Sequence, residues 1–370
     1  MSGMKGLAVR DLHVSFGKHE LLRGIDLDVA PGETLVLFGP SGCGKTVLLR
    51  AVAGLEPAAY CQVTIDGRDV SSLGPEHRGL GMAFQNFALY PHMTARQNIA
   101  SPLEARNIGA AECQQKVAAV AELLRITHVL GHAPRALSNG QKQRTALARA
   151  LVGNPRVLLL DDPLRNVDAK LRYEMRLELP RLLRRAGAAT IYVSQDYREA
   201  MALGDRVAII QDGRIAQLAP PEAVYDTPAS VQVARLFGDP PINLLACRPT
   251  DVGGRLVARA AGIEVTLRGG ADLLGRECLL GLRPETLVVS ATARPGAAAT
   301  ELVAVTPLHE RLVLLLRGSG GEEIVASVIG TAPPAGSPVW VAADPAHTLL
   351  FNAASGALLQ QGVIAQGIAA

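Results

Sequence analysis

The eight residues Gly39–Thr46 constrain the fold of this chain more than any other segment. They read Gly-Pro-Ser-Gly-Cys-Gly-Lys-Thr and fit the pattern GxxxxGK[ST] at every fixed position. An apolar stretch, Thr34–Phe38, precedes them, and a stretch with helical character, Val47–Ala53, follows. Glycines allow backbone N–H groups to turn inward around a phosphate, and a helix N-terminus adds positive potential. The segment therefore predicts a phosphate-binding loop between a buried strand and a helix.

Three side chains in and beyond this loop predict a site for ATP and Mg²⁺. Lys45 supplies a mobile positive charge for the outer phosphates, and the hydroxyl of Thr46 suits Mg²⁺. A second apolar stretch, Val157–Leu160, ends in Asp161. An aspartate at the end of such a strand can hold the Mg²⁺ shell. The two motifs together predict a P-loop NTPase.

The hydrophobic pattern divides the chain into two expected domains, 1–236 and 237–370. In the first, short apolar runs alternate with helical stretches such as Ala110–Leu130 and Lys170–Arg185, which is typical of an α/β domain with a largely parallel sheet. Beyond Phe237, short alternating runs are separated by Gly- and Pro-containing turns. Many short strands at that spacing predict a small β-barrel or β-sandwich.

Composition and charge give no support to several other classes of protein. The formal net charge is +3, from 37 basic and 34 acidic residues, and so even a balance gives no support for nucleic-acid binding. No apolar run approaches the roughly 20 residues that cross a bilayer, and the first ten residues lack the apolar core of a signal peptide. An odd, scattered set of cysteines without a CxxC pair argues against a disulfide framework or a structural zinc site and favours a reducing cytoplasm. They are Cys43, Cys61, Cys113, Cys247 and Cys278.

Several segments resemble the conserved motifs of ATP-binding-cassette (ABC) ATPases. Leu137–Gln141, which reads Leu-Ser-Asn-Gly-Gln, resembles their signature motif, and Met82–Gln85 resembles their Q-loop. Arg165–Asp168 resembles their D-loop, and Phe16 stands where the family keeps an aromatic that stacks on adenine. The resemblance implies an α/β P-loop NTPase with a helical subdomain at about 86–155, and a dimer in which two subunits sandwich ATP.

The resemblance also implies a set of site residues. The ATP contacts it implies are Phe16, Gly39, Pro40, Ser41, Gly42, Cys43, Gly44, Lys45, Thr46 and Val47, with Ser138, Gly140 and Gln141 reaching the ATP of the opposite subunit. The implied Mg²⁺ ligands are Thr46, Gln85 and Asp161, and the implied catalytic residues are Lys45, Gln85, Asp162 and Gln195.

Within that family the chain is most similar to the ATPase subunits of carbohydrate importers, the maltose-transporter type. The segments that carry this similarity are Phe84–Met93, Asp168–Arg172, Gly281–Glu285 and Val339–Phe351, the last resembling a closing strand pair. The resemblance implies an all-β, OB-like regulatory domain at the C-terminus and a role in importing a sugar, polyol or glycerol-type solute. Phe87–Met93 is interpreted either as a socket for a partner helix or as core of the helical subdomain.

The same resemblance implies partners and a location. The expected partners are a second ABC ATPase subunit, in a homodimer or heterodimer, and two transmembrane permease subunits. An extracytoplasmic solute-binding protein would act indirectly. The expected location is peripheral, at the cytoplasmic face of the inner (plasma) membrane.

Three residues depart from the family pattern. Asp162 replaces the usual Glu after the Asp161 strand, Gln195 replaces the switch His, and Asn139 replaces a Gly of the signature motif. A shorter carboxylate misplaces the group that orients the attacking water, and Gln cannot carry a proton near neutral pH. Asn139 is expected to be tolerated because Asn adopts left-handed backbone geometry readily. ATP binding is therefore expected to be intact and hydrolysis weakened.

Two explanations of that weakening remain open, as do two other functions. The chain is either a slowly hydrolysing family member or one half of an asymmetric pair whose partner supplies a complete Glu and His. One alternative function is a non-catalytic structural or regulatory subunit that binds ATP. The other is a soluble ABC ATPase unrelated to transport, although tandem cassettes and coiled-coil insertions, which mark that class, are not evident in this sequence.

Overall fold

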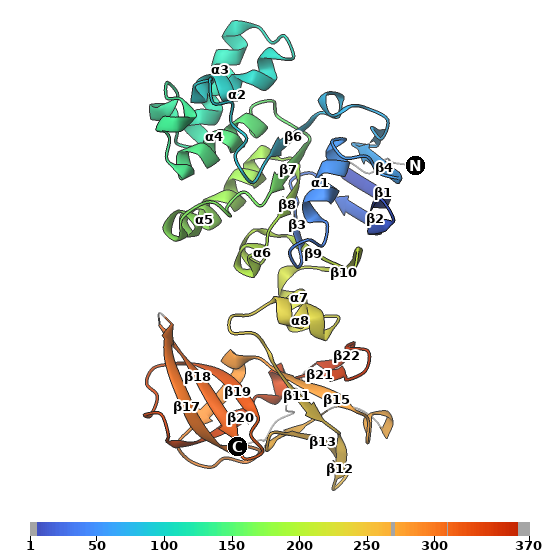
Figure 1. Ribbon diagram of the computed structural model, residues 1–370, viewed down its shortest axis with the longest axis vertical. Helices are drawn as coiled ribbons and strands as arrows, with labels where there is room; N and C mark the ends of the chain where they lie inside the picture. Colours follow the sequence, from blue (N-terminus) through green and yellow to red (C-terminus); the bar gives the residue numbers. More distant parts are fainter. Residues whose placement is uncertain (1–5, 268–270, 309, 362–370) are drawn as a thin grey trace. The chain divides into compact units, whose positions relative to one another are not determined.

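The computed structural model describes residues 6–267, 271–308 and 310–361 (Figure 1). Contacts divide the chain into two compact units, Met1–Pro221 and Glu222–Ala370. The division falls 15 residues before the boundary predicted at residue 236. The outer ends of the predicted domains, 1–5 and 362–370, lie outside the described residues. Each unit is described by itself below.

A six-stranded sheet forms the centre of the first unit, in the order β10-β9-β3-β8-β7-β6. The neighbouring strands are parallel except β9 and β10. Every residue of β3, β7 and β8 is buried, which explains why the sequence shows them as continuous apolar runs. In sheet order the strands are Arg214–Ala219, Arg206–Gln211, Thr34–Phe38, Ala189–Val193, Val157–Asp161 and Leu80–Ala83.

A second, antiparallel sheet in this unit was not predicted from the sequence. Its order is β2-β1-β4-β5, with the strands His19–Val29, Leu7–Phe16, Tyr60–Ile65 and Arg68–Asp69. The pairing of β1 with β2 contains three register shifts, and each shift breaks the alternation by which a half-buried strand is recognised. Helix α1 (Lys45–Ala53) shares one hydrophobic core with both sheets, so the two layers form one body.

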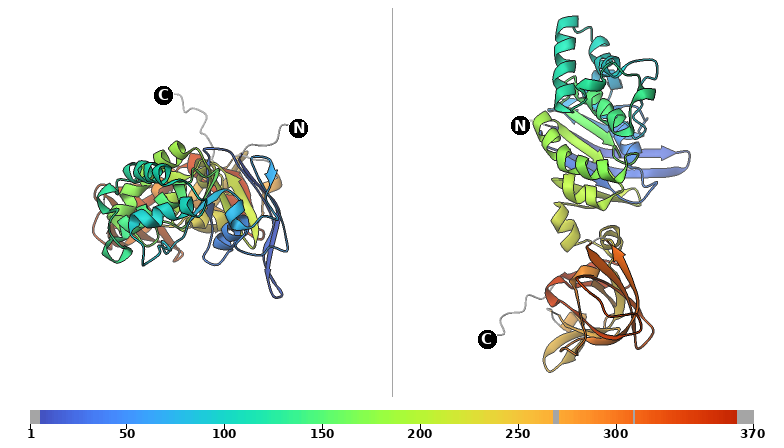
Figure 2. Two further views of the ribbon diagram at one scale, coloured as in Figure 1. Left: turned by 90° about the horizontal axis from the view of Figure 1, so that it is seen from above. Right: turned by 90° about the vertical axis from the view of Figure 1, so that its left-hand side faces the viewer.

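Helices occupy the segment between β6 and β7 and gather at one end of the unit (Figures 1 and 2). They are α2 (Ala95–Glu104), α3 (Ala110–Leu123) and α4 (Asn139–Leu151). The predicted helix from Ala110 ends at Leu123, before the expected Leu130, because Arg125 adopts a left-handed conformation with φ of 56°. Two further helices, α5 (Ala169–Ala186) and α6 (Tyr197–Leu203), follow β7 and β8. In the part of the chain that the structure describes, no helix is both long and apolar enough to cross a membrane.

The predicted domain boundary at residue 236 is too late in the chain, because two helices that precede it belong to the second unit. These helices, α7 (Pro221–Asp226) and α8 (Val231–Leu236), precede the turn that suggested the boundary. Val231 and Ala234 of α8 pack into one cluster with buried residues that come later in the chain, among them Ile242 and Phe351. The backbone N–H of Val231 also donates to Gly356 O at 2.8 Å. The helices therefore fold with the C-terminal unit.

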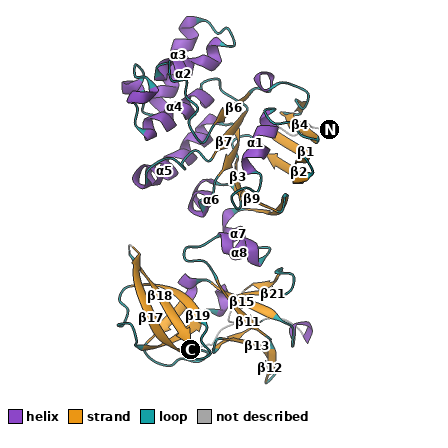
Figure 3. Cartoon of the chain, in the orientation of Figure 1, coloured by secondary structure: helices purple, strands orange, loops and turns teal. Residues whose placement is uncertain are grey.

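Strands dominate the rest of the second unit (Figure 3). Its three sheets have the orders β11-β15-β21-β22, β12-β13-β14 and β16-β20-β17-β18-β19. In chain order from β11 to β22 the strands are Asn243–Cys247, Thr250–Val252, Arg255–Ala260, Ile263–Thr266, Cys278–Leu282, Leu287–Ser290, Ala298–Leu308, Arg311–Gly318, Glu323–Ile329, Pro338–Ala343, Leu349–Asn352 and Leu358–Gln361. Short 3₁₀ turns occur at Pro75–His77, Thr127–Val129, Pro134–Ala136, Ala271–Leu273, Pro284–Thr286 and Pro345–His347.

Two features of this unit differ from what the sequence suggests. Val339–Phe351 supplies β20 and β21, but these strands lie in different sheets and do not pair with each other. Cys247 and Cys278, which appear scattered in the sequence, stand directly opposite each other on β11 and β15. Both thiols are free and buried.

Candidate functional site

The phosphate-binding loop leaves the carboxyl end of β3 and enters α1. Gly39 has a φ of 149°, and a Cβ added there would lie 2.5 Å from Ile210 O on the neighbouring strand. Gly44, the N-cap of α1, has a φ of 103°, and a Cβ there would lie 2.7 Å from Leu22 Cδ2. Only glycine fits such positions without strain. Between them Pro40, Ser41 and Gly42 are exposed, so the tip of the loop is open to a ligand.

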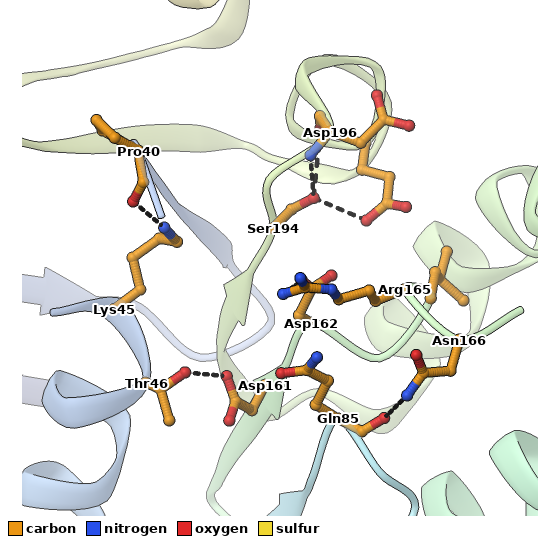
Figure 4. Close-up of polar contacts among 12 residues, drawn as sticks. Pro40, Lys45, Thr46, Gln85, Asp161, Asp162, Arg165, Asn166, Ser194 and Asp196 are labelled. Carbon is orange, nitrogen blue, oxygen red and sulfur yellow. Dashed lines mark hydrogen bonds and ion pairs between the residues drawn. The ribbon is translucent and has the colours of Figure 1, made fainter. Parts of the chain in front are cut away.

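Lys45 is folded back into the loop that it follows. Its side chain is buried, and Nζ donates to Gly39 O at 2.8 Å and to Pro40 O at 2.7 Å (Figure 4). Backbone carbonyls are neutral acceptors, so a phosphate would form the stronger, charge-assisted bond with this ammonium group. The geometry places one cation at the centre of the loop.

Thr46 and Asp161 join the loop to the end of β7. Thr46 Oγ1 donates to Asp161 Oδ1 at 2.8 Å, and the side chain of Gln85 points toward the same carboxylate from the end of β6 (Figure 4). Burial raises the pKa of Asp161, and the bond from Thr46 partly offsets this. Hydroxyl, carboxylate and amide oxygens are the donors that Mg²⁺ prefers. The fold thus brings together the three residues predicted as Mg²⁺ ligands.

The carboxylate of Asp162 is buried, and few neighbouring groups offset its negative charge. It follows Asp161, has a left-handed backbone with φ of 45°, and is 5% exposed. Its Oδ2 has no hydrogen-bond partner among the described residues, and the nearest recorded cation, Arg165 Nη1, lies 3.8 Å away. Burial, together with the neighbouring Glu199, raises the pKa of Asp162 to about 6, although Arg165 acts in the opposite direction. Such a carboxyl is a candidate proton acceptor next to a bound phosphate.

Glu199 is a residue of this region that the sequence analysis missed. It is 2% exposed on α6, and its Oε2 accepts from Ser194 Oγ at 2.8 Å and from Tyr192 Oη at 2.9 Å. Burial raises its pKa. Ser194 Oγ in turn accepts from the backbone N–H of Asp196 at 3.0 Å (Figure 4). Glu199 therefore fixes the turn that carries Gln195, whose side chain is exposed.

The signature segment lies at the N-terminus of α4. Ser138 caps this helix: its Oγ accepts from Gln141 N at 3.3 Å, and Gln141 Oε1 accepts from Ser138 N at 3.0 Å. Gly140 is buried, and a Cβ there would lie 2.0 Å from Leu171 Cδ2 on α5. Within the described residues no recorded hydrogen bond joins this segment to the phosphate-binding loop of the same chain.

Asn139 does not adopt the left-handed backbone geometry that was expected to make it tolerated. Asn139 is the first residue of α4 and has an ordinary right-handed helical backbone, since it is not among the residues with positive φ. Asn139 and Ser138 are both exposed. A polar side chain at an exposed first helical position fits without any special backbone conformation.

Phe16 lies at the end of β1, next to the tight turn that leads into β2. Its side chain is 50% exposed, which is unusual for a large apolar residue. Phe16 is therefore not part of the hydrophobic core. An exposed ring is free to stack on a planar base.

The Phe87–Met93 segment lines a groove rather than filling the core. None of its side chains is buried, and Tyr90 is 46% exposed. Residues of β6, α2 and α4 complete a groove of about 490 Å³ around Ala88 and Tyr90. The groove is lined mainly by apolar side chains, and Arg149 lies over the Tyr90 ring at 5.5 Å.

Two buried or partly buried polar side chains hold that segment in place. Asn98 of α2 is fully buried; its Oδ1 accepts from Tyr90 N at 2.7 Å, and its Nδ2 donates to Tyr90 O, Met93 O and Thr94 O, each at 3.1 Å. Arg149 of α4 donates to Ala88 O at 2.8 Å and to Phe87 O at 3.1 Å. The shape of the groove is thus set by α2 and α4 together.

Comparisons with known proteins agree with this geometry. A family model described as ABC transporter matches residues 22–165, and one described as TOBE domain matches residues 280–351. The sn-glycerol-3-phosphate import ATP-binding protein UgpC 1 of Rhizobium johnstonii is 38% identical over 361 residues, which cover 98% of each chain. The trehalose/maltose import ATP-binding protein MalK of Thermococcus litoralis is 41% identical over 345 residues, covering 90% of this chain and 91% of the relative.

Solved structures with a similar fold include one of an ATP-binding cassette. It is the dimeric structure of a post-hydrolysis state of the ATP-binding cassette MJ0796 bound to ADP and Pi. It is similar with a TM-score of 0.52 and 26% identity, and the match covers 58% of this chain and 98% of that one.

Proposed function

This chain belongs to the ABC transporter family, and on that basis we propose that it is the ATPase subunit of an importer for a sugar, a polyol or a glycerol-type solute. Two relatives that match 98% and 90% of the chain are import ATP-binding proteins for sn-glycerol-3-phosphate and for trehalose and maltose. The observation that carries the proposal is the cluster of Lys45, Thr46 and Asp161 at the carboxyl edge of the sheet. Lys45 would bind the phosphates of ATP, and Thr46 and Asp161 would hold the Mg²⁺ that accompanies them.

Mg²⁺ fits the oxygen donors beside this loop. Asp161 is 3% exposed and its described hydrogen bond comes from a hydroxyl, so its negative charge is left for a cation. The hydroxyl of Thr46, the carboxylate of Asp161 and the amide oxygen of Gln85 would hold the ion. When bound, Mg²⁺ neutralises charge on the outer phosphates. Lys45 would exchange its two carbonyl acceptors for phosphate oxygens.

A second ATPase subunit would complete the site. Ser138 and Asn139 are exposed, and the signature segment has no recorded hydrogen bond to the loop of its own chain within the described residues. The N-terminus of α4 would meet the ATP of an opposing subunit, where its N–H groups favour negative charge. The partner is a second copy of this chain or a different ATPase. ATP bound between two subunits would stabilise the closed dimer.

The groove beside Tyr90 is the proposed contact with the membrane-spanning permease subunits. Its apolar lining suits the apolar face of an inserted helix. Ala88 and Tyr90, which line it, closely follow Gln85 in the chain, so movement at the groove would reach the nucleotide site. This contact would hold the protein at the cytoplasmic face of the membrane. A solute-binding protein on the other side would act through the permease.

Hydrolysis is proposed to be slow in this subunit. Asp162 retains a carboxylate on a shorter side chain, and the exposed Gln195 cannot transfer a proton as His does. The same observation favours the second candidate, a subunit that binds ATP and supports a catalytic partner.

The test is equilibrium ATP binding and Mg²⁺-dependent hydrolysis by the full chain, alone and with its permease subunits in membranes. ATP binding together with turnover that rises when the permease is present supports the proposal. Binding with no turnover under either condition supports the non-catalytic subunit. Failure of the folded chain to bind ATP would refute both.

A further inference from the structure

Arg165 lies beside the nucleotide site without a close partner for its charge. Its Nη1 is 3.8 Å from Asp162 Oδ2, which is too far for a hydrogen bond, and this is the contact recorded for its guanidinium among the described residues. The side chain is 48% exposed and extends over Asp162 from the side opposite Lys45 (Figure 4). A long, half-exposed ion pair contributes little to stability. Packing alone therefore does not explain its position.

Hydrogen bonds hold the backbone around Arg165, whereas its guanidinium is half exposed. Arg172 donates to Leu164 O, Arg165 O and Val167 O at 3.1 to 3.2 Å. Asn166 Nδ2 donates to Gln85 O at 2.9 Å, which ties the loop to the end of β6 (Figure 4). The loop thus aims Arg165 at the site, and an exposed guanidinium keeps the freedom to reach a ligand.

The distribution of charge around the site favours a second cation beside the terminal phosphate. Asp161, Asp162 and Glu199 are buried carboxyl groups on one side, whereas Lys45 is the cation of the loop on the other. A terminal phosphate near Asp162 would meet like charge on that side. Arginine binds phosphate oxygens through paired N–H groups and stabilises the charge that develops during phosphoryl transfer.

We propose that Arg165 contacts the terminal phosphate of the ATP held by the phosphate-binding loop of the same chain. The guanidinium exchanges its long ion pair with Asp162 for charge-assisted hydrogen bonds to that phosphate, and the freed Asp162 Oδ2 faces the attacking water. The inference rests on the proposed ATPase function. ADP lacks the terminal phosphate, so loss of this contact should lower the affinity for ATP and leave the affinity for ADP unchanged.

The test compares the affinities of the full chain for ADP and for a non-hydrolysable ATP analogue with an intact triphosphate, both with Mg²⁺. In Arg165→Ala the analogue should bind about tenfold more weakly, because charge-assisted hydrogen bonds are lost, while ADP affinity stays within about twofold. Arg165→Lys should lie between, since it keeps the charge without the paired geometry. Arg181→Ala, which removes an exposed arginine of α5, is the matched control and should bind both nucleotides as the parent does.

Each other outcome overturns the inference. If Arg165→Ala weakens both nucleotides equally, Arg165 acts on the fold of the loop. If neither affinity changes while turnover rises, Arg165 restrains Asp162 through their ion pair and does not contact the phosphate. A parent chain that binds neither nucleotide refutes the ATPase function itself, and that result is separate because it appears before any substitution is made.

Discussion

Lys45 is the residue on which nucleotide binding should depend most. It is the one side chain of the loop that brings a full positive charge, and it is held 2.7 to 2.8 Å from loop carbonyls. Lys45→Ala should lower ATP affinity at least tenfold, about 1.4 kcal/mol, in an equilibrium titration. Lys18→Ala, which removes an exposed lysine in the β1–β2 turn, is the control for loss of charge alone. Unchanged affinity in Lys45→Ala would contradict the assignment of the loop.

Asp162 and Gln195 should limit the rate of hydrolysis more than the affinity for ATP. The double variant Asp162→Glu, Gln195→His lengthens the carboxylate by one methylene and restores a group that can carry a proton. Both changes act mainly in the transition state, so kcat should rise about 10- to 10³-fold with little change in KM. Their effects should be non-additive, since they address one phosphate from two sides.

Steady-state kinetics on a dimer of known composition checks this prediction. A contaminating subunit with an intact site would mask the change, so each preparation is compared with a Lys45→Ala sample carried through the same purification. If the double variant is no faster than the parent, the limit lies elsewhere, in subunit closure or in the need for membrane partners.

At the scale of elements, β6 and α4 approach unusually closely. A Cβ added at Gly81 of β6 would lie 2.2 Å from Ala150 O, a backbone atom of α4 that cannot move away alone. Gly81→Ala should therefore lower the free energy of unfolding by about 1–3 kcal/mol, measured by denaturant titration. Gly131→Ala, where a Cβ meets nothing within 4 Å, should be close to neutral. Equal stability of the two variants would show that the strand and helix can separate without cost.

The elements that could be predicted from the sequence are those whose burial leaves a clear pattern. β3 and β7 are buried on both faces and read as unbroken apolar runs, so the loop and Asp161 at their ends could be placed beforehand. β1 and β2 were not predicted because bulges interrupt the alternation of buried and exposed residues along them. Glu199 was not predicted as a site residue because the local sequence of a short helix does not show whether an acidic side chain is buried or exposed. The role of α7 and α8 depends on residues more than 100 positions later, which no local pattern reveals.

At the scale of the whole molecule, the division at Pro221 predicts which fragment binds ATP. Each predicted phosphate and Mg²⁺ ligand precedes that point. A fragment of residues 1–221 should fold and bind ATP with the affinity of the full chain, as measured by titration. A fragment of residues 1–237 keeps α7 and α8 without the surface that buries Val231 and Ala234, so it should be less soluble. A folded 1–221 fragment that does not bind ATP would contradict this separation.

The buried amide of Asn98 gives the segment behind Tyr90 mechanical stiffness. The side chain of Asn98 forms hydrogen bonds with the backbone of Tyr90, Met93 and Thr94, and Arg149 of α4 bonds the backbone of Ala88. Bending of this loop under a load on the exposed ring of Tyr90 would require several of these hydrogen bonds to break together. A displacement of this segment would therefore move α2 and α4 with it. If a permease helix occupies the groove as proposed, movement of that helix reaches α2 and α4 through these hydrogen bonds.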